Sequence, residues 1–201
     1  RTPLNAIVGF SNMLLDDKSL PDSAKDEVND IVMASDNLLE IVNGILDISK
    51  IEAGKLEIIN TEYVFNKVTT ELIALTRGRL GDKPIEFITK IDESIPQVLY
   101  GDSSRLKQIC VNILTNAVKY TKEGSIIFSI NSVIKNDVCR LIISVEDTGI
   151  GIKQENLNKL FNKFERLDLK DNITIEGTGL GLAITKKLVD MMNGKIVVQS
   201  V

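Results

Sequence analysis

A long run of residues at heptad spacing constrains the fold of this chain more than any other feature of its sequence. From about residue 23 to residue 52, apolar residues and two serines recur at alternating three- and four-residue steps. This spacing puts them on one side of an α-helix and is typical of helices that pack lengthwise against other helices. The series comprises Val28, Ile31, Ser35, Leu38, Val42, Ile45 and Ser49, and Val32, Leu39 and Leu46 flank it.

A shorter amphipathic helix is predicted in front of this one, from Leu4 to Leu15. Residues 16–23 separate the two helices, because they contain polar turn formers and Pro21. Asp22 and Ser23 are candidates to cap the second helix. The sequence therefore predicts a helical hairpin.

The apolar stripe of this hairpin is wider than a contact between two helices can bury. Self-association of two hairpins into a four-helix bundle would cover the remaining face, so we expect a homodimer. The alternative is that the rest of the same chain covers that face, since heptad spacing alone does not prove dimerisation.

The pattern changes after Ala53-Gly54-Lys55, where glycine favours the end of a helix. We therefore expect two domains, a hairpin at 1–54 and a second domain at 55–201. In the second domain, strands are predicted at 57–59, 85–91, 125–134, 140–145 and 196–199, and helices at 64–77, 103–120, 154–160 and 180–192. Helices layered on a mixed sheet form an α/β sandwich, so the fold class of the whole chain is α+β.

Composition excludes several classes of function. The net charge of −4 argues against nucleic acid as a partner, because binding its phosphates requires positive charge. The chain has no histidine, which removes His-based triads and most catalytic zinc sites. Cys110 and Cys139 have no metal-binding spacing and are expected to be buried free thiols in a reducing cytoplasm. No apolar run reaches the length of about 18 residues that a membrane-spanning helix needs.

Three segments of the second domain carry residues suited to a ligand site. Asn112, Asn116, Lys119 and Tyr120 share one side of the predicted helix, where amide oxygens suit Mg²⁺ and a lysine suits phosphate. The run Asp147-Thr148-Gly149-Ile150-Gly151 follows a strand and could bring a carboxylate and bare backbone to a nucleobase. Phe161 and Phe164 precede a polar stretch, Leu167 to Glu176, that resembles a mobile lid. Taken singly, these could be an exposed polar face, an ordinary turn and core packing.

A fourth segment is a glycine-rich loop that runs into a helix, Gly177-Thr178-Gly179-Leu180-Gly181. Unpaired backbone N–H groups and the positive end of the helix dipole make such a loop an anion site. Its glycine spacing is not that of the dinucleotide fingerprint, and it lacks the lysine of a mononucleotide P-loop.

In this order across residues 103–184, the four segments resemble the ATP-binding domain of histidine kinases, a fold shared with Hsp90-type chaperones, type II topoisomerases and mismatch-repair ATPases. Arg1-Thr2-Pro3-Leu4 is similar to the end of the phosphoacceptor motif of sensor histidine kinases, His-Glu-Leu-Arg-Thr-Pro-Leu. The resemblance implies a two-component kinase core that transfers the γ-phosphoryl group of ATP to a histidine and then to an aspartate of a response-regulator receiver domain.

The resemblance also implies ATP and Mg²⁺ as cofactors and assigns roles to matching residues. Asn116 would be the Mg²⁺ ligand with Asn112 beside it, and Lys119 would contact phosphate. Thr2 would help to orient water for dephosphorylation of the regulator, next to Arg1 in the acceptor motif. The residues assigned to the adenine and phosphates are Tyr120, Asp147, Gly149, Gly151, Gly177, Thr178, Gly179, Leu180 and Gly181.

The acceptor histidine itself would lie three residues before Arg1, so the 201 residues alone are not expected to phosphorylate themselves. Two other interpretations remain open, an ATPase that acts as a conformational machine and a non-catalytic dimerisation module. We expect a cytoplasmic segment, attached to a membrane only through parts outside this chain.

Overall fold

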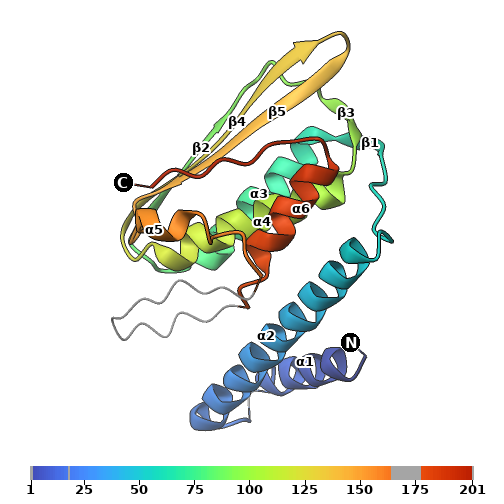
Figure 1. Cartoon of the computed structure of the whole chain (residues 1–201). Coiled ribbons are helices and arrows are strands. Elements are labelled where there is room, and N and C mark those ends of the chain that lie inside the picture. Colours follow the sequence, from blue (N-terminus) through green and yellow to red (C-terminus); the bar gives the residue numbers. More distant parts are fainter. Residues whose placement is uncertain (1, 18, 164–177, 201) are drawn as a thin grey trace.

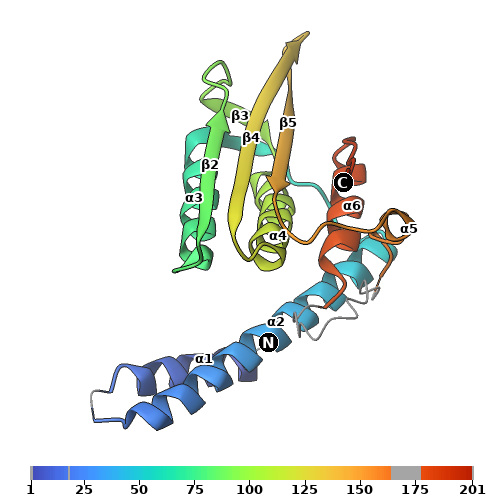
Figure 2. The same cartoon turned by 90° about the vertical axis from the view of Figure 1, so that its left-hand side faces the viewer.

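A computed structural model of the chain describes residues 2–17, 19–163 and 178–200. It begins with the predicted hairpin of α1 (Thr2–Leu15) and α2 (Asp22–Glu52), which lie side by side and extend away from the rest of the molecule (Figures 1 and 2). None of the helices in the described ranges is long and apolar enough to cross a membrane.

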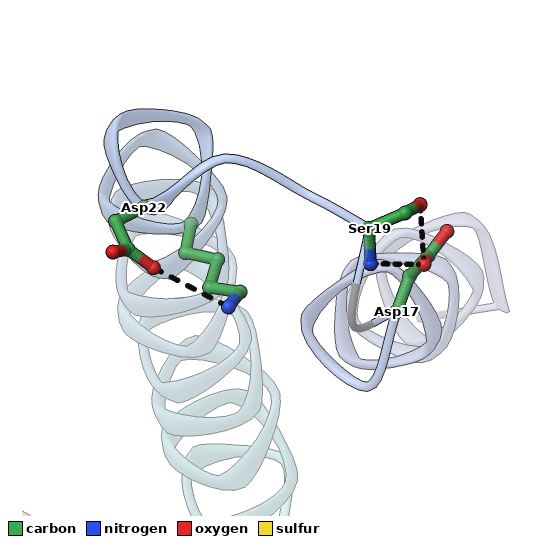
Figure 3. A network of polar contacts seen from close by, with 4 residues as sticks. Asp17, Ser19 and Asp22 are labelled. Atoms are coloured by element: carbon green, nitrogen blue, oxygen red, sulfur yellow. Dashed lines mark hydrogen bonds and ion pairs between the residues drawn. The ribbon is translucent and has the colours of Figure 1, made fainter.

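Local hydrogen bonds shape the turn between α1 and α2. The Asp17 carboxylate accepts hydrogen bonds from the backbone N–H and the hydroxyl of Ser19, at 2.8 and 2.7 Å (Figure 3). These bonds hold the pKa of Asp17 below its ordinary value. The N-cap of α2 is Pro21 and makes no side-chain cap, so the predicted capping by Asp22 or Ser23 is wrong.

The heptad series of α2 divides into two lines of residues. Val28 and Ser35 are buried at 8% and 7% exposure, as is Ser11 of α1. Ile31, Leu38 and Ile45 remain 47%, 45% and 45% exposed. The hairpin therefore buries one line of the stripe and leaves an apolar line uncovered.

The second part of the chain has two sheets. β1 (Thr61–Val64) pairs antiparallel with β3 (Val98–Gly101). β2 (Ile85–Ile91) pairs parallel with β4 (Gly124–Lys135), which pairs antiparallel with β5 (Val138–Asp147). The helices are α3 (Phe65–Leu80), α4 (Ser103–Tyr120), α5 (Gln154–Leu157) and α6 (Gly181–Met191). The mixed sheet and the helical layer confirm the predicted α+β fold class.

The main core lies between the three-stranded sheet and the pair α3 and α4 (Figure 2). Alternate residues of β4 face it, and Ile126, Phe128 and Ile130 are at most 2% exposed. Phe65 and Leu72 from α3 meet them. Burying each such side chain stabilises the fold by about 1.5–3 kcal/mol, which makes this core the platform for α4.

Several predicted boundaries were wrong. Residues 57–59 are not a strand, because the Ile59 N–H bonds the side chain of Asp102 and Ile58 packs near α6. The four-residue β3, which pairs with β1, was missed. Residues 196–199 form no strand in the described chain, and α5 ends at Leu157 rather than at residue 160. Cys110 is buried as expected, but Cys139 is partly exposed.

A second core joins the hairpin to the α/β part. Ile48 and Ile51 of α2 pack against a cluster from the linker, α4 and α6. Gly44 of α2 lies so close to α6 that a Cβ there would be 3.2 Å from the Leu180 side chain. The Asp47 carboxylate also accepts a hydrogen bond of 2.7 Å from Gln108 of α4. Part of the apolar face of α2 is thus covered by its own chain, as the alternative to dimerisation anticipated.

Candidate nucleotide-binding site

The helix α4 is the element on which the candidate site is built, and Asp102 fixes where it starts. One carboxylate oxygen of this buried N-cap accepts the N–H of Arg105 at 3.0 Å. The other accepts the N–H of Ile59 at 2.9 Å. Asp102 therefore holds both the helix start and the linker that arrives from α2.

Asn112 ties the middle of α4 to the start of α6. Its Nδ2 donates to the carbonyl oxygen of Gly181 at 3.1 Å and to the hydroxyl of buried Thr185 at 3.2 Å. Because a carbonyl oxygen can only accept, Nδ2 must face α6. The amide oxygen Oδ1 takes no part in these two bonds and keeps its capacity to accept or to bind a cation.

Asn116, Lys119 and Tyr120 continue the same side of α4 toward its C-terminal end, and all three are half-buried. The Lys119 ammonium nitrogen lies 5.5 Å from the centroid of the Tyr120 ring, within the range of a cation–π interaction. A cation, an aromatic ring and two amides thus follow one another along less than three turns of helix.

The loop after β5 is folded tightly against the end of α4. Asp147 is exposed, and its Oδ1 accepts the N–H of Gly149 at 2.9 Å. A Cβ on Gly149 would lie 2.6 Å from the carbonyl oxygen of Tyr120, and the N–H of Ile150 bonds that same oxygen at 3.3 Å. Only glycine fits this approach. One oxygen of Asp147 is thereby held, and the other remains available to a ligand.

The glycine-rich loop leads directly into the first turn of α6. Gly179 has φ +67°, a conformation that favours glycine. The Thr178 hydroxyl accepts the N–H of Leu180 at 3.2 Å, and Leu180 is buried in the core beside α2. Gly181 begins α6, whose first N–H groups have no partner within the helix.

The structure thus brings three of the four predicted segments together on α4. Asn112 contacts the glycine-rich loop, and the Tyr120 carbonyl oxygen contacts the loop after β5. Gly151, at φ +66°, is exposed beyond that contact. Thr2 is exposed on the first turn of α1, in the hairpin. Arg1, Phe164, Gly177 and the predicted lid lie outside the described residues.

Two surface hollows lie elsewhere, one between α3 and α4 and one on α3 alone. They are lined by residues such as Leu75, Arg79 and Val111 and include none of the candidate residues.

Four residues with structural roles at the site were missed from the sequence. Thr185 bonds Asn112, Gly44 touches Leu180, and Thr148 contacts Gly124 across the end of the sheet. Of these four, only Thr148 could have been found from the sequence, because it lies inside the candidate ligand segment at residues 147–151. The others contribute through contacts between distant segments, which local patterns do not encode.

Two family models match the chain. The model described as histidine kinase-, DNA gyrase B- and HSP90-like ATPase matches residues 101–201, which contain every candidate ligand residue from Asn112 onward. The model of the His Kinase A (phospho-acceptor) domain matches residues 1–54, the helical hairpin.

Characterised relatives match over nearly the full length of this chain. It is 38% identical over 201 residues to hybrid signal transduction histidine kinase B of Dictyostelium discoideum. It is 36% identical over 197 residues to signal transduction histidine-protein kinase BarA of Escherichia coli. These matches cover 100% and 98% of the chain but only 10% and 21% of the relatives.

A solved structure has the same architecture. Full-length ShkA in complex with AMPPNP superimposes with a TM-score of 0.72 at 27% identity, over 100% of this chain and 42% of that one. The hairpin and the α/β part therefore occur together in a protein crystallised with an ATP analogue.

Proposed function

This chain belongs to the histidine kinase-, DNA gyrase B- and HSP90-like ATPase family, and on that premise we propose that it is the catalytic core of a two-component sensor histidine kinase. In this proposal the α/β part binds ATP, and its γ-phosphoryl group is transferred to a histidine on the helical hairpin. A receiver domain of a response regulator then takes the phosphoryl group onto an aspartate.

One observation supports the assignment of the nucleotide site. A single helix, α4, contacts both the glycine-rich loop, through Asn112, and the loop after β5, through the Tyr120 carbonyl oxygen. These loops supply complementary chemistry, because the first offers N–H groups at a helix start to phosphates and the second offers a carboxylate to a base.

The roles of the chain's own residues follow from this geometry. The free oxygen of Asp147 accepts the exocyclic amine of adenine, while Gly149 holds the other oxygen. Tyr120 flanks the base, and Lys119 neutralises phosphate charge. Gly179 and Gly181 let the backbone approach the phosphates at the start of α6.

The donor chemistry also fits Mg²⁺ bound together with the nucleotide. The amide of Asn112 is held by the two bonds that its Nδ2 donates to Gly181 and Thr185, which leave its oxygen as an acceptor on the same helix as Asn116. Amide oxygens with phosphate oxygens are ligands that Mg²⁺ accepts. The ion supplies electrostatic stabilisation of phosphoryl transfer when it is bound.

The acceptor and the partners belong to the whole protein. The chain contains no histidine, so the acceptor has to come from residues outside these 201, and the hairpin's match to a phospho-acceptor domain supports a position next to α1. We propose in addition that two hairpins pair into a dimer, and that Thr2 and Arg1 act at the acceptor in exchange with the response regulator.

The nucleotide site is tested by calorimetric titration with a non-hydrolysable ATP analogue and Mg²⁺. Asp147→Asn should weaken binding about tenfold or more, because an NH2 group, which only donates, replaces the carboxylate oxygen that faces either Gly149 or the base. Asn116→Ala should weaken binding only when Mg²⁺ is present.

Matched controls exist on the sheet. Asp137→Asn in the turn after β4 and Asn131→Ala on β4 change exposed residues away from α4 and should leave the affinity unchanged. Unchanged affinity in Asp147→Asn and Asn116→Ala would show that the site is assigned wrongly.

The kinase activity is tested in a longer piece of the protein that includes the residues before Arg1. Radiolabelled ATP should leave an acid-labile, base-stable phosphoryl group on a histidine. Hydrolysis of ATP with no phosphorylated protein would instead favour a conformational ATPase.

A further inference from the structure

The contact between Thr148 and Gly124 is the closest that any glycine of the candidate site makes. A Cβ on Gly124 would lie 2.2 Å from the Thr148 hydroxyl oxygen and 3.3 Å from Thr148 Cβ. Gly124 also has φ +107°, which disfavours any other residue. The Thr148 side chain therefore lies directly on bare backbone at the first residue of β4.

The Thr148 hydroxyl ends the ladder between β4 and β5. The register pairs Ile126 with Asp147, so Ser125 and Thr148 come next. The Thr148 N–H bonds the Ser125 carbonyl oxygen at 3.1 Å, as an antiparallel ladder requires. The returning bond, however, runs from the Ser125 N–H to the Thr148 hydroxyl oxygen at 2.9 Å, and not to the Thr148 carbonyl oxygen.

Because the Thr148 hydroxyl oxygen takes the place of the Thr148 carbonyl oxygen as acceptor, the backbone can leave the sheet immediately after Asp147. The Thr148 carbonyl is released from the ladder, and the chain turns at Gly149 toward the end of α4. The hydroxyl also has two carbonyl oxygens within reach as acceptors, those of Glu123 and Ser125, each at 3.4 Å. The short bond from the Ser125 N–H therefore holds the hydroxyl oxygen in place, and the hydroxyl can still donate within the protein.

We propose that Thr148 is a positioning residue for adenine recognition: its hydroxyl, seated on Gly124, sets the direction in which β5 presents the Asp147 carboxylate. This inference rests on the proposed function, because it assumes that Asp147 accepts the adenine amine. Thr148 acts through Asp147 and does not itself touch the nucleotide.

The test compares the affinities of the 201-residue chain for ADP and for inosine diphosphate, which has an oxo group in place of the amine. Thr148→Ala should weaken ADP about tenfold and leave inosine diphosphate within about twofold, since only the first uses the aimed carboxylate. Thr148→Ser keeps the hydroxyl and should keep the wild-type preference for ADP. Thermal unfolding of each variant checks the fold, and Thr148→Val is the second hydroxyl-free variant if Thr148→Ala unfolds.

Two results would overturn the proposal. Equal weakening of both nucleotides would mean general damage to the loop or direct contact with the phosphates. Unchanged preference for ADP in both hydroxyl-free variants would mean that Asp147 needs no such support. Asp147→Asn distinguishes failure of the positioning role of Thr148 from failure of the adenine site itself. If Asp147→Asn abolishes the preference for ADP while Thr148→Ala does not, only the positioning role fails. If Asp147→Asn has no effect, the proposed adenine site fails.

Discussion

At the scale of single residues, the candidate site depends on positions where a side chain is missing. Gly149 admits the carbonyl oxygen of Tyr120, and Gly124 admits the hydroxyl of Thr148, at distances that no Cβ tolerates. A Cβ on Gly78 of α3, by contrast, would have nothing within 4 Å. Close contacts thus restrict Gly149 and Gly124 to glycine, whereas Gly78 has no such restriction.

The two cysteines differ in environment, and this predicts different reactivity. Burial raises the pKa of the Cys110 thiol to about 12, so it stays protonated and inaccessible. Cys139 is partly exposed on β5. A thiol reagent at pH 8 should modify one cysteine in the native chain and two in urea, and Cys139→Ser should abolish the native reaction.

The same pKa shift has a consequence for stability at high pH. In the unfolded chain, Cys110 ionises near its ordinary pKa of 9.0, whereas in the folded chain it stays protonated to about 12. The folded state therefore binds the extra proton between these values, and its stability falls as the pH rises through this window.

At the scale of elements, Asp102 fixes the start of α4, and residues farther along α4 contact the two loops of the site. Asp102 joins the linker to the helix by bonds to the N–H groups of Ile59 and Arg105. Since α4 contacts one loop of the site through Asn112 and the other through the Tyr120 carbonyl oxygen, a shift of its start would move both contacts together.

Asp102→Ala should destabilise the chain by about 1–3 kcal/mol, because it leaves two partly buried N–H groups without an acceptor and removes the N-cap of α4. Asp102→Asn, which keeps one acceptor oxygen, should cost less. Urea unfolding measures both, with Asp137→Asn as an exposed control. Equal stability of Asp102→Ala and wild type would contradict the role of Asp102 as the anchor of α4.

At the scale of the whole molecule, the described contacts of the hairpin with the α/β part come from the C-terminal end of α2. Gly44 of α2 faces Leu180 of the glycine-rich loop, which is the N-cap of α6, and Ile184 one turn later. The position of the loop is thereby coupled to the position of the hairpin helix.

This packing can be tested with a disulfide. A Cβ on Gly44 would lie 3.5 Å from the Cβ of Leu180, within the range of disulfide geometry. The double variant Gly44→Cys, Leu180→Cys, made in a Cys139→Ser background, should form an intramolecular crosslink under mild oxidation, seen as a mobility shift on a non-reducing gel. Gly9→Cys with Leu180→Cys is the matched control and should not crosslink within one chain.

The uncovered line of α2 predicts association of two chains. Ile31, Leu38 and Ile45 are nearly half exposed at successive heptad steps, although Val28 and Ser35 beside them are buried. The double variant Ile31→Glu, Leu38→Glu should shift the chain from dimer to monomer in sedimentation equilibrium, because charges would replace apolar contacts. Ile142→Glu, at an exposed apolar position of β5, should leave the dimer intact. A monomeric wild-type chain would contradict the prediction.

Some helices and strands were predicted from the sequence more accurately than others. The helix Ser103–Tyr120 and the strand Ile85–Ile91 were predicted to the residue, because each combines strong periodicity with a clear polar or proline boundary. The strand expected at 57–59 was wrong and β3 was missed, because short strands depend on a partner rather than on their own pattern. The site residues on α4 came from side-chain chemistry, and their ligand roles stay predictions.

Local properties of the chain, such as helix periodicity, glycine loops and amide pairs, were enough to predict the hairpin, the helices, the three strands of the larger sheet and the ligand-suited residues. Only the tertiary structure decided that Asn112 meets Thr185, 73 residues away, and that the Thr148 hydroxyl takes the place of a ladder bond from Ser125, 23 residues away. The reason is physical: such bonds depend on distances between atoms that packing of the core brings together, and no local pattern specifies those distances.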